Sequence, residues 1–70
     1  MLIFNIFVNN VFLTVYGDDY RINHTVSGDK VIIIEHDDFV IFYGRLCDIR
    51  KIILFGENGD STIIYKSEVI

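Results

Sequence analysis

Apolar and polar residues alternate along much of this chain, and short groups of turn-forming residues interrupt the alternation. The first alternating segments are residues 2–8 and 11–16, which flank Asn9–Asn10. Because asparagine tolerates a positive φ, this pair predicts a two-residue type I′ turn between antiparallel strands. The turn sets the register of the hairpin and places Phe7 opposite Phe12.

The two faces of this hairpin differ in polarity, since successive side chains of a strand point to opposite sides. One face is wholly apolar and is predicted to join the core: Leu2, Phe4, Ile6, Val8, Val11, Leu13 and Val15. The other face mixes aromatic, aliphatic and polar residues: Ile3, Asn5, Phe7, Phe12, Thr14 and Tyr16. Aromatic anchors beside polar groups are typical of protein-binding surfaces. We therefore expect Phe7, Phe12 and Tyr16 to contact a partner.

Further strand patterns follow between turns rich in Gly, Asp and Asn. Residues 20–26 alternate strictly, and the next apolar segments are 31–35 and 39–43. The last hairpin has strands 51–55 and 62–66 around Asn58–Gly59, whose type I′ turn would place Leu54 opposite Ile63. Between these segments, Leu46 and Ile49 lie three residues apart, which allows at most one short helical turn near residues 45–50.

These patterns predict a single all-β domain over residues 1–70. We expect a small antiparallel meander of about six strands, because loops of two to five residues make sequential neighbours pair. The sheet would curl into a barrel or half-barrel to bury its apolar face. Several strands are apolar on both faces, more than one small sheet can hide, so we expect the chain to form a homo-oligomer or to present a large binding surface.

The composition supports strands and gives a hint about the source. The 70 residues include 13 Ile, 7 Val and 3 Thr, and they include no Ala, Gln, Pro or Trp. β-Branched residues favour strands. The abundant residues have AT-rich codons, which is typical of small phage, viral or mobile-element proteins and equally of proteins from AT-rich bacteria.

Charge and cysteine content exclude several classes of protein. A net charge of −4 disfavours direct nucleic-acid binding and docking on an anionic membrane, both of which need basic surfaces. No apolar run approaches the roughly 18 residues of a membrane-spanning helix. Cys47 is the single cysteine, which fits a reducing compartment. We therefore predict a cytoplasmic protein (host cytoplasm if viral) with Cys47 buried as a small apolar residue.

The remaining candidate chemistry consists of paired carboxylates at two turns, Asp18–Asp19 and Asp37–Asp38. Adjacent aspartates are common turn residues, and no set of ligands has the spacing of a metal site. No nucleophile with a neighbouring base and no glycine-rich phosphate loop is present. We therefore predict no catalytic residue, cofactor or metal, and we assign the two acidic turns to contact with a basic surface of a partner.

The leading hypothesis is a small non-enzymatic protein that binds and inhibits or modulates a host protein or protein complex, such as a defence or nucleic-acid-processing complex. One alternative is an oligomeric binder of a nucleotide or other small anion, which Tyr43, Arg45, Arg50 and Lys51 would contact. A second alternative is a structural or assembly subunit of a virion.

Overall fold

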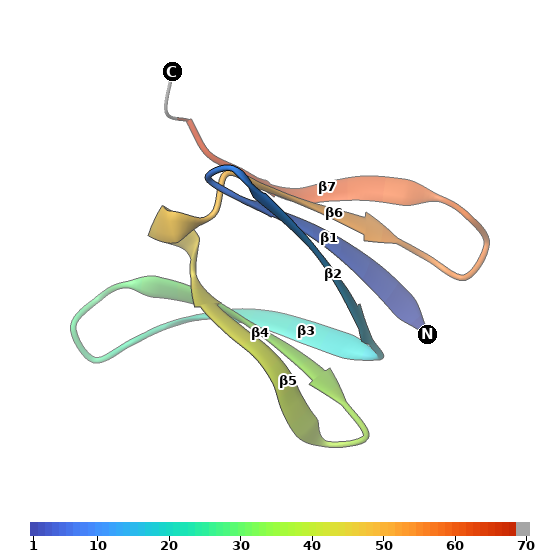
Figure 1. Cartoon of the computed structure of the whole chain (residues 1–70). Coiled ribbons are helices and arrows are strands. Elements are labelled where there is room, and N and C mark those ends of the chain that lie inside the picture. Colours follow the sequence, from blue (N-terminus) through green and yellow to red (C-terminus); the bar gives the residue numbers. More distant parts are fainter. Residues whose placement is uncertain (69–70) are drawn as a thin grey trace.

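The computed structural model describes residues 1–68, which form two antiparallel sheets and one 3₁₀ turn (Figure 1). The elements are β1 (Leu2–Val8), β2 (Val11–Gly17), β3 (Asp19–His24), β4 (Lys30–His36), β5 (Phe39–Arg45), η1 (Leu46–Asp48), β6 (Lys51–Phe55) and β7 (Ser61–Lys66). The all-β class and the short helical turn are confirmed. The expected count of about six strands is wrong, because each alternating segment forms a strand of its own and the total is seven.

The sheets have the strand orders β2-β1-β6-β7 and β3-β4-β5. The predicted meander holds only within the hairpins, because β2 does not pair with β3 and β5 does not pair with β6. Instead β1 pairs with β6, which joins the beginning of the chain to its last third. The strands thus form two separate sheets, and the predicted barrel closure is not seen.

Gly17 explains why β2 and β3 lie in different sheets. A Cβ at this residue would lie 2.7 Å from Cγ2 of Ile34 and 2.9 Å from the carbonyl oxygen of Glu35. The amide of Asp18, the next residue, donates to that same carbonyl at 2.9 Å. The chain therefore passes closely over β4 and continues in the second sheet, where a glycine permits the tight bend at the corner.

The first hairpin has the predicted register, with Phe7 opposite Phe12 and Phe4 opposite Val15. Its turn differs in type, because only Asn9 has a positive φ (53°), which is the φ pattern of a type II′ turn. The type I′ pattern occurs instead in the β4–β5 hairpin, where Asp37 and Asp38 have φ values of 50° and 67°.

The last hairpin has a different loop from the predicted one. Gly59 has a φ of 84°, and the amide of Gly56 donates to the carbonyl of Asp60 at 2.9 Å, so three residues form the loop. Such a loop ends in a residue with left-handed φ and a bulge. Leu54 accordingly lies opposite Thr62 rather than Ile63, and a separate register shift between Ile52 and Ile53 restores the register of the predicted hairpin for Ile52 and Lys51.

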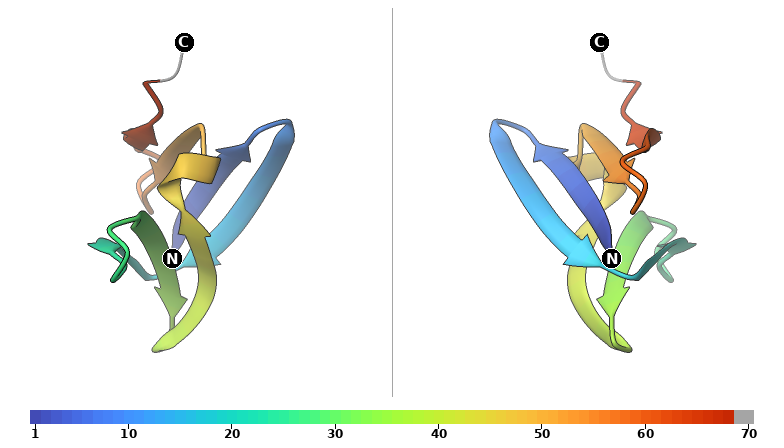
Figure 2. Two further views of the ribbon diagram at one scale, coloured as in Figure 1. Left: turned by 90° about the vertical axis from the view of Figure 1, so that its left-hand side faces the viewer. Right: turned by 90° about the vertical axis from the view of Figure 1, so that its right-hand side faces the viewer.

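The core lies between the inner faces of the two sheets. The four-stranded sheet contributes Phe4, Ile6 and Ile52, the three-stranded sheet contributes Ile32 and Ile34, and the η1 region adds Leu46 and Ile49. The predicted core face of the first hairpin is only partly buried, since Val11 and Leu13 are exposed. These two residues lie toward the hairpin tip, which extends away from β4 and β5 (Figure 2).

The expectation that Cys47 is buried is wrong. Cys47 is exposed on the 3₁₀ turn, because the neighbouring Leu46 and Ile49 fill the core instead. Within β3 only Tyr20 is partly buried, since β3 is an edge strand. No helix among the described residues is long and apolar enough to span a membrane.

Candidate interaction surface

The face of the four-stranded sheet that points away from the core is rich in apolar and aromatic side chains. We call it the outer face. The strand registers place seven such residues on it: Ile3, Phe7, Phe12, Tyr16, Ile53, Phe55 and Ile63. Phe12, Tyr16 and Ile63 are each 54–55% exposed. The three-stranded sheet packs on the opposite side, so this face is open to solvent.

The outer face is ordered by contacts between its own side chains. The rings of Phe7 and Phe12 pack edge to face with centroids 4.9 Å apart. Next to them the hydroxyl of Thr14 donates to Oδ1 of Asn5 at 3.3 Å. Phe7, Phe12 and Tyr16, which the sequence predicts as contact residues, therefore share one face.

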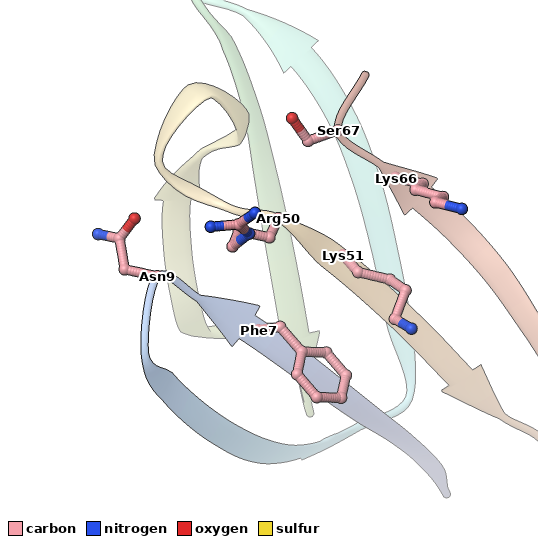
Figure 3. Close-up of a pocket in the computed structure, with 6 residues that line it drawn as sticks. All are labelled: Phe7, Asn9, Arg50, Lys51, Lys66 and Ser67. Atoms are coloured by element: carbon pink, nitrogen blue, oxygen red, sulfur yellow. The ribbon is translucent and has the colours of Figure 1, made fainter. Parts of the chain in front are cut away.

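A basic pocket borders the Phe12 end of the outer face (Figure 3). Its cavity volume is about 340 Å³, and it is lined by Phe7, Asn9, Arg50, Lys51, Lys66 and Ser67. Figure 3 shows Arg50 between Asn9 and Ser67, with Lys51 extending toward Phe7. The ammonium nitrogen of Lys51 lies 5.2 Å from the centroid of the Phe7 ring.

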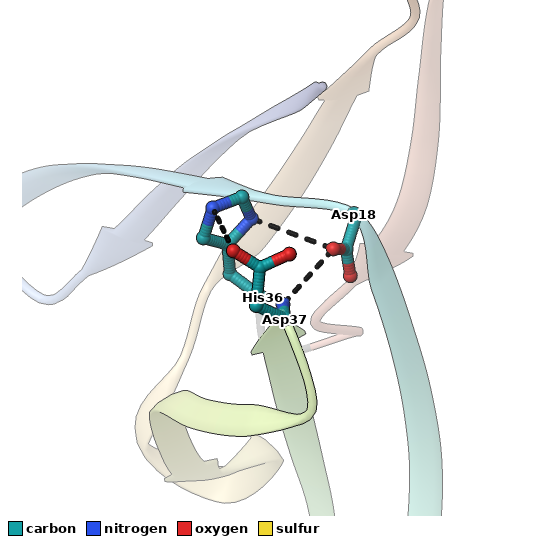
Figure 4. A group of neighbouring side chains, drawn as sticks. All are labelled: Asp18, His36 and Asp37. Atoms are coloured by element: carbon teal, nitrogen blue, oxygen red, sulfur yellow. Dashed lines mark hydrogen bonds and ion pairs between the residues drawn. The ribbon is translucent and has the colours of Figure 1, made fainter.

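An acidic corner borders the Tyr16 end of the outer face, where the β2–β3 connection meets the β4–β5 turn (Figure 4). Oδ2 of Asp18 accepts the amide hydrogen of Asp37 at 3.0 Å. The two ring nitrogens of His36 lie 3.4 Å from Oδ2 of Asp18 and 3.4 Å from Oδ2 of Asp37. The structure thus brings together the two acidic turns that the sequence singles out.

Asp18, His36 and Asp37 each offer a ligand atom within 4.8 Å of the others, so they are the residues that could hold a metal ion. The same contacts also have a purely structural effect, because they fix the corner to the β4–β5 turn. Asp18 is about half exposed and Asp37 is largely exposed. Neither shows the burial that an enclosed metal centre requires, and we assign no metal to this cluster.

The four residues predicted as anion contacts do not lie together. Arg50 and Lys51 line the basic pocket, whereas Tyr43 and Arg45 lie on β5 in the other sheet. Arg45 is paired with Asp48 at 3.3 Å, and this carboxylate raises the pKa of the Arg45 guanidinium. Arg45 therefore already has its counter-charge.

Sequence reasoning missed several residues of these surfaces. Lys66 lies opposite Lys51, and the predicted type I′ register of the last hairpin already implies this pair. Asn9 reaches the pocket because β1 pairs with β6, for which the sequence has no local signal. Edge strand β5 also exposes apolar side chains, among them Phe39 and Val40, which sequence reasoning does not single out.

Comparison of the chain with known protein families, curated proteins and solved structures finds no match. The arguments about function therefore start from the two-sheet fold, the outer face and the charged groups at its two ends. These features describe an all-β protein whose four-stranded sheet has an uncovered, largely apolar face.

Proposed function

We propose that this chain is a non-enzymatic interaction protein that binds a partner protein with the outer face of its four-stranded sheet. The observation that carries the proposal is the group of seven apolar and aromatic side chains across four strands, among which Phe12 and Tyr16 are more than half exposed. Apolar patches of this kind on soluble proteins mark interaction sites, and large aromatic side chains commonly dominate their binding free energy.

The order within the outer face supports this function. Phe7 and Phe12 are held edge to face, so little side-chain entropy remains to be lost when a partner covers them. Ile63 supplies apolar area on the opposite edge strand. Asn5 and Thr14 provide polar groups between the two apolar ends, a mixture that is usual in interfaces.

The charged groups at the two ends of the outer face give the partner a preferred orientation. Arg50, Lys51 and Lys66 border the Phe12 end, and Asp18 and Asp37 border the Tyr16 end. The partner we expect therefore carries an apolar patch with basic groups on the side that meets the acidic corner. The AT-rich residue usage supports a host protein or protein complex as this partner.

Site-specific photo-crosslinking tests the proposal. A photoreactive phenylalanine analogue at residue 12 should crosslink to the partner in cells of the natural host or a related species. The same analogue at residue 26 is the control, because Val26 is fully exposed but lies in the β3–β4 turn, away from the outer face. The effect of substitutions is measured in a separate chain that carries the photoreactive analogue at residue 63 instead of residue 12. In that chain, Phe12→Ser and Tyr16→Ser should each reduce the crosslinking yield at least about tenfold, the loss expected of an interface anchor.

The identity of the crosslinked products distinguishes two kinds of partner. A crosslink between two copies of the chain supports a homo-oligomer, and a crosslink to one defined host protein supports a heteromeric complex. Equal crosslinking from residues 12 and 26, or full crosslinking by folded Phe12→Ser and Tyr16→Ser variants, would overturn the assignment to the outer face. Urea midpoints like that of the unsubstituted chain would show that the variants are folded.

A further inference from the structure

Three of the six basic residues of this acidic chain converge on one pocket. Arg50, Lys51 and Lys66 all line it, while the whole sequence has ten acidic residues and a net charge of −4. Among the described residues no carboxylate lines this pocket. The local charge is therefore opposite in sign to that of the protein as a whole.

The three cations form no ion pair within residues 1–68. The ion pairs of this part of the chain involve Met1, Arg21, His36 and Arg45 as the positive partners. Asp48 lines a neighbouring hollow together with Arg50, but its carboxylate pairs with Arg45 at 3.3 Å.

This grouping is unfavourable in the absence of an anion. Lys51 and Lys66 are direct partners in the β6–β7 register, and like charges directly opposite each other on neighbouring strands destabilise a sheet. Arg50 adds a third positive charge next to Lys51 in the sequence. A bound anion would turn this repulsion into attraction.

The backbone holds the pocket in place. The amide of Arg50 donates to the carbonyl of Phe7 at 2.7 Å, and the carbonyl of Arg50 accepts from the amide of Ser67 at 2.8 Å. These bonds tie together the ends of β1, β6 and β7 around Arg50. The Lys51 ammonium lies over the Phe7 ring, which limits the directions in which this side chain can move.

From this arrangement we infer that the pocket binds the phosphate group of a small phosphorylated ligand. The guanidinium of Arg50 can form two parallel hydrogen bonds to phosphate oxygens, and the two lysines can neutralise the remaining charge. The Asn9 side-chain amide, which lies on the same rim, is a further hydrogen-bond donor. This site is separate from the centre of the outer face and does not depend on the binding of a partner protein there.

Titration of the full chain with inorganic phosphate, followed by amide NMR shifts, tests the inference. We expect saturable shifts at Asn9, Arg50, Lys51 and Lys66 that sodium chloride of equal ionic strength does not produce. Arg50→Gln should weaken the affinity about tenfold, the loss expected for a charge-assisted hydrogen bond. Arg21→Gln is the matched control, because it removes the same charge from β3 in the other sheet and should leave the affinity within about twofold, the weak effect of a screened distant charge.

A second titration with adenosine monophosphate distinguishes the possible sources of the phosphate group. Equal affinity for both probes means that the phosphate group alone is recognised. Tighter binding of the nucleotide, with shifts of the Phe7 and Phe12 ring signals, means that the base or sugar is also contacted. The inference is wrong if phosphate produces no more than the chloride control, or if Arg21→Gln weakens binding as much as Arg50→Gln does.

Discussion

Gly17 lies so close to Ile34 that a Cβ at residue 17 would come within 2.7 Å of Cγ2 of the isoleucine. Ile34 is fully buried, and the carbonyl of Glu35 blocks the other side at 2.9 Å. This contact is the point at which the chain leaves the four-stranded sheet and enters the three-stranded sheet. The close approach of β2 to β4 therefore requires a residue without a side chain.

Gly17→Ala is expected to destabilise the protein by about 1–3 kcal/mol, the usual cost of inserting a methyl group into a packed site. The free energy of unfolding from urea denaturation measures the effect. Gly56→Ala is the control, because a Cβ at that residue would have only one neighbour, at 4.0 Å. Its effect should stay within about 0.5 kcal/mol, and similar losses for both variants would contradict the packing argument.

Asp38→Gly is expected to stabilise the protein by about 1 kcal/mol, because Asp38 has a φ of 67° and glycine adopts this conformation without steric cost. The contacts of Asp37 and His36 at the acidic corner are retained in this variant. Thermal unfolding would measure the change. Asp60→Gly makes the same chemical change where φ is not positive and should destabilise instead, so stabilisation by both variants would count against the explanation.

Ile52→Val should destabilise the protein by about 1 kcal/mol, because Ile52 is fully buried between the sheets and the lost methyl group leaves a small cavity. Ile63→Val makes the same change on the exposed outer face, and its effect should stay below about 0.5 kcal/mol. Urea denaturation of both variants compares the two positions directly. Equal losses would show that the outer face is covered in solution.

Glu57 should contribute a small, pH-dependent stabilisation. It accepts a hydrogen bond from the N-terminal ammonium of Met1, and this bond, together with the charge of the ammonium group, holds the pKa of Glu57 below its usual value of 4.5. A lowered pKa in the folded state stabilises the protein above the ordinary carboxyl pKa, and the effect is lost as the pH falls through the folded-state pKa.

The stability difference between the unsubstituted chain and Glu57→Gln should therefore be present near about pH 6 and disappear by about pH 2. Urea denaturation at several pH values measures it. N-terminal acetylation removes the ammonium charge and should abolish the difference, whereas Glu68→Gln should show no comparable dependence on Met1. A difference that persists at low pH or after acetylation would exclude this ion pair as the cause.

Much of the local structure follows from the sequence. The Asn9–Asn10 pair sets the register of the first hairpin, because in a two-residue loop the turn determines every opposing pair. The alternation within that hairpin also identifies Phe7, Phe12 and Tyr16 as members of one face, separate from Phe4.

The loop of the last hairpin does not follow from its local sequence. Asn58–Gly59 is a good signal for a two-residue loop, but the structure forms a three-residue loop with Gly59 in the left-handed region. This loop changes the partner of Leu54, and the register shift between Ile52 and Ile53 restores the predicted register in the first part of β6. Both loops suit the same residues, so the local sequence does not decide between them.

The residues of the basic pocket come together in part through a strand pairing that local sequence patterns do not predict. The pairing of Lys51 with Lys66 can be read from a hairpin register, since both residues belong to one hairpin. Asn9 joins these residues only because β1 pairs with β6, more than 40 residues further along the chain. No turn residue specifies this pairing. The sequence therefore predicts one group of Tyr43, Arg45, Arg50 and Lys51, but Tyr43 and Arg45 lie on β5, apart from the pocket.

The sequence by itself determined the strands, most of the turns and the two faces of the first hairpin, because φ preferences and alternation act over a few residues. Only the tertiary structure decided which strands share a sheet, that β2 and β3 separate at Gly17, and which charged groups meet at the two ends of the outer face. These features depend on contacts between distant segments, whose free energy comes from burial of Phe4, Ile34 and Ile52 together. For that reason the number of apolar faces predicts an interaction surface, and the fold shows only where the exposed apolar side chains lie.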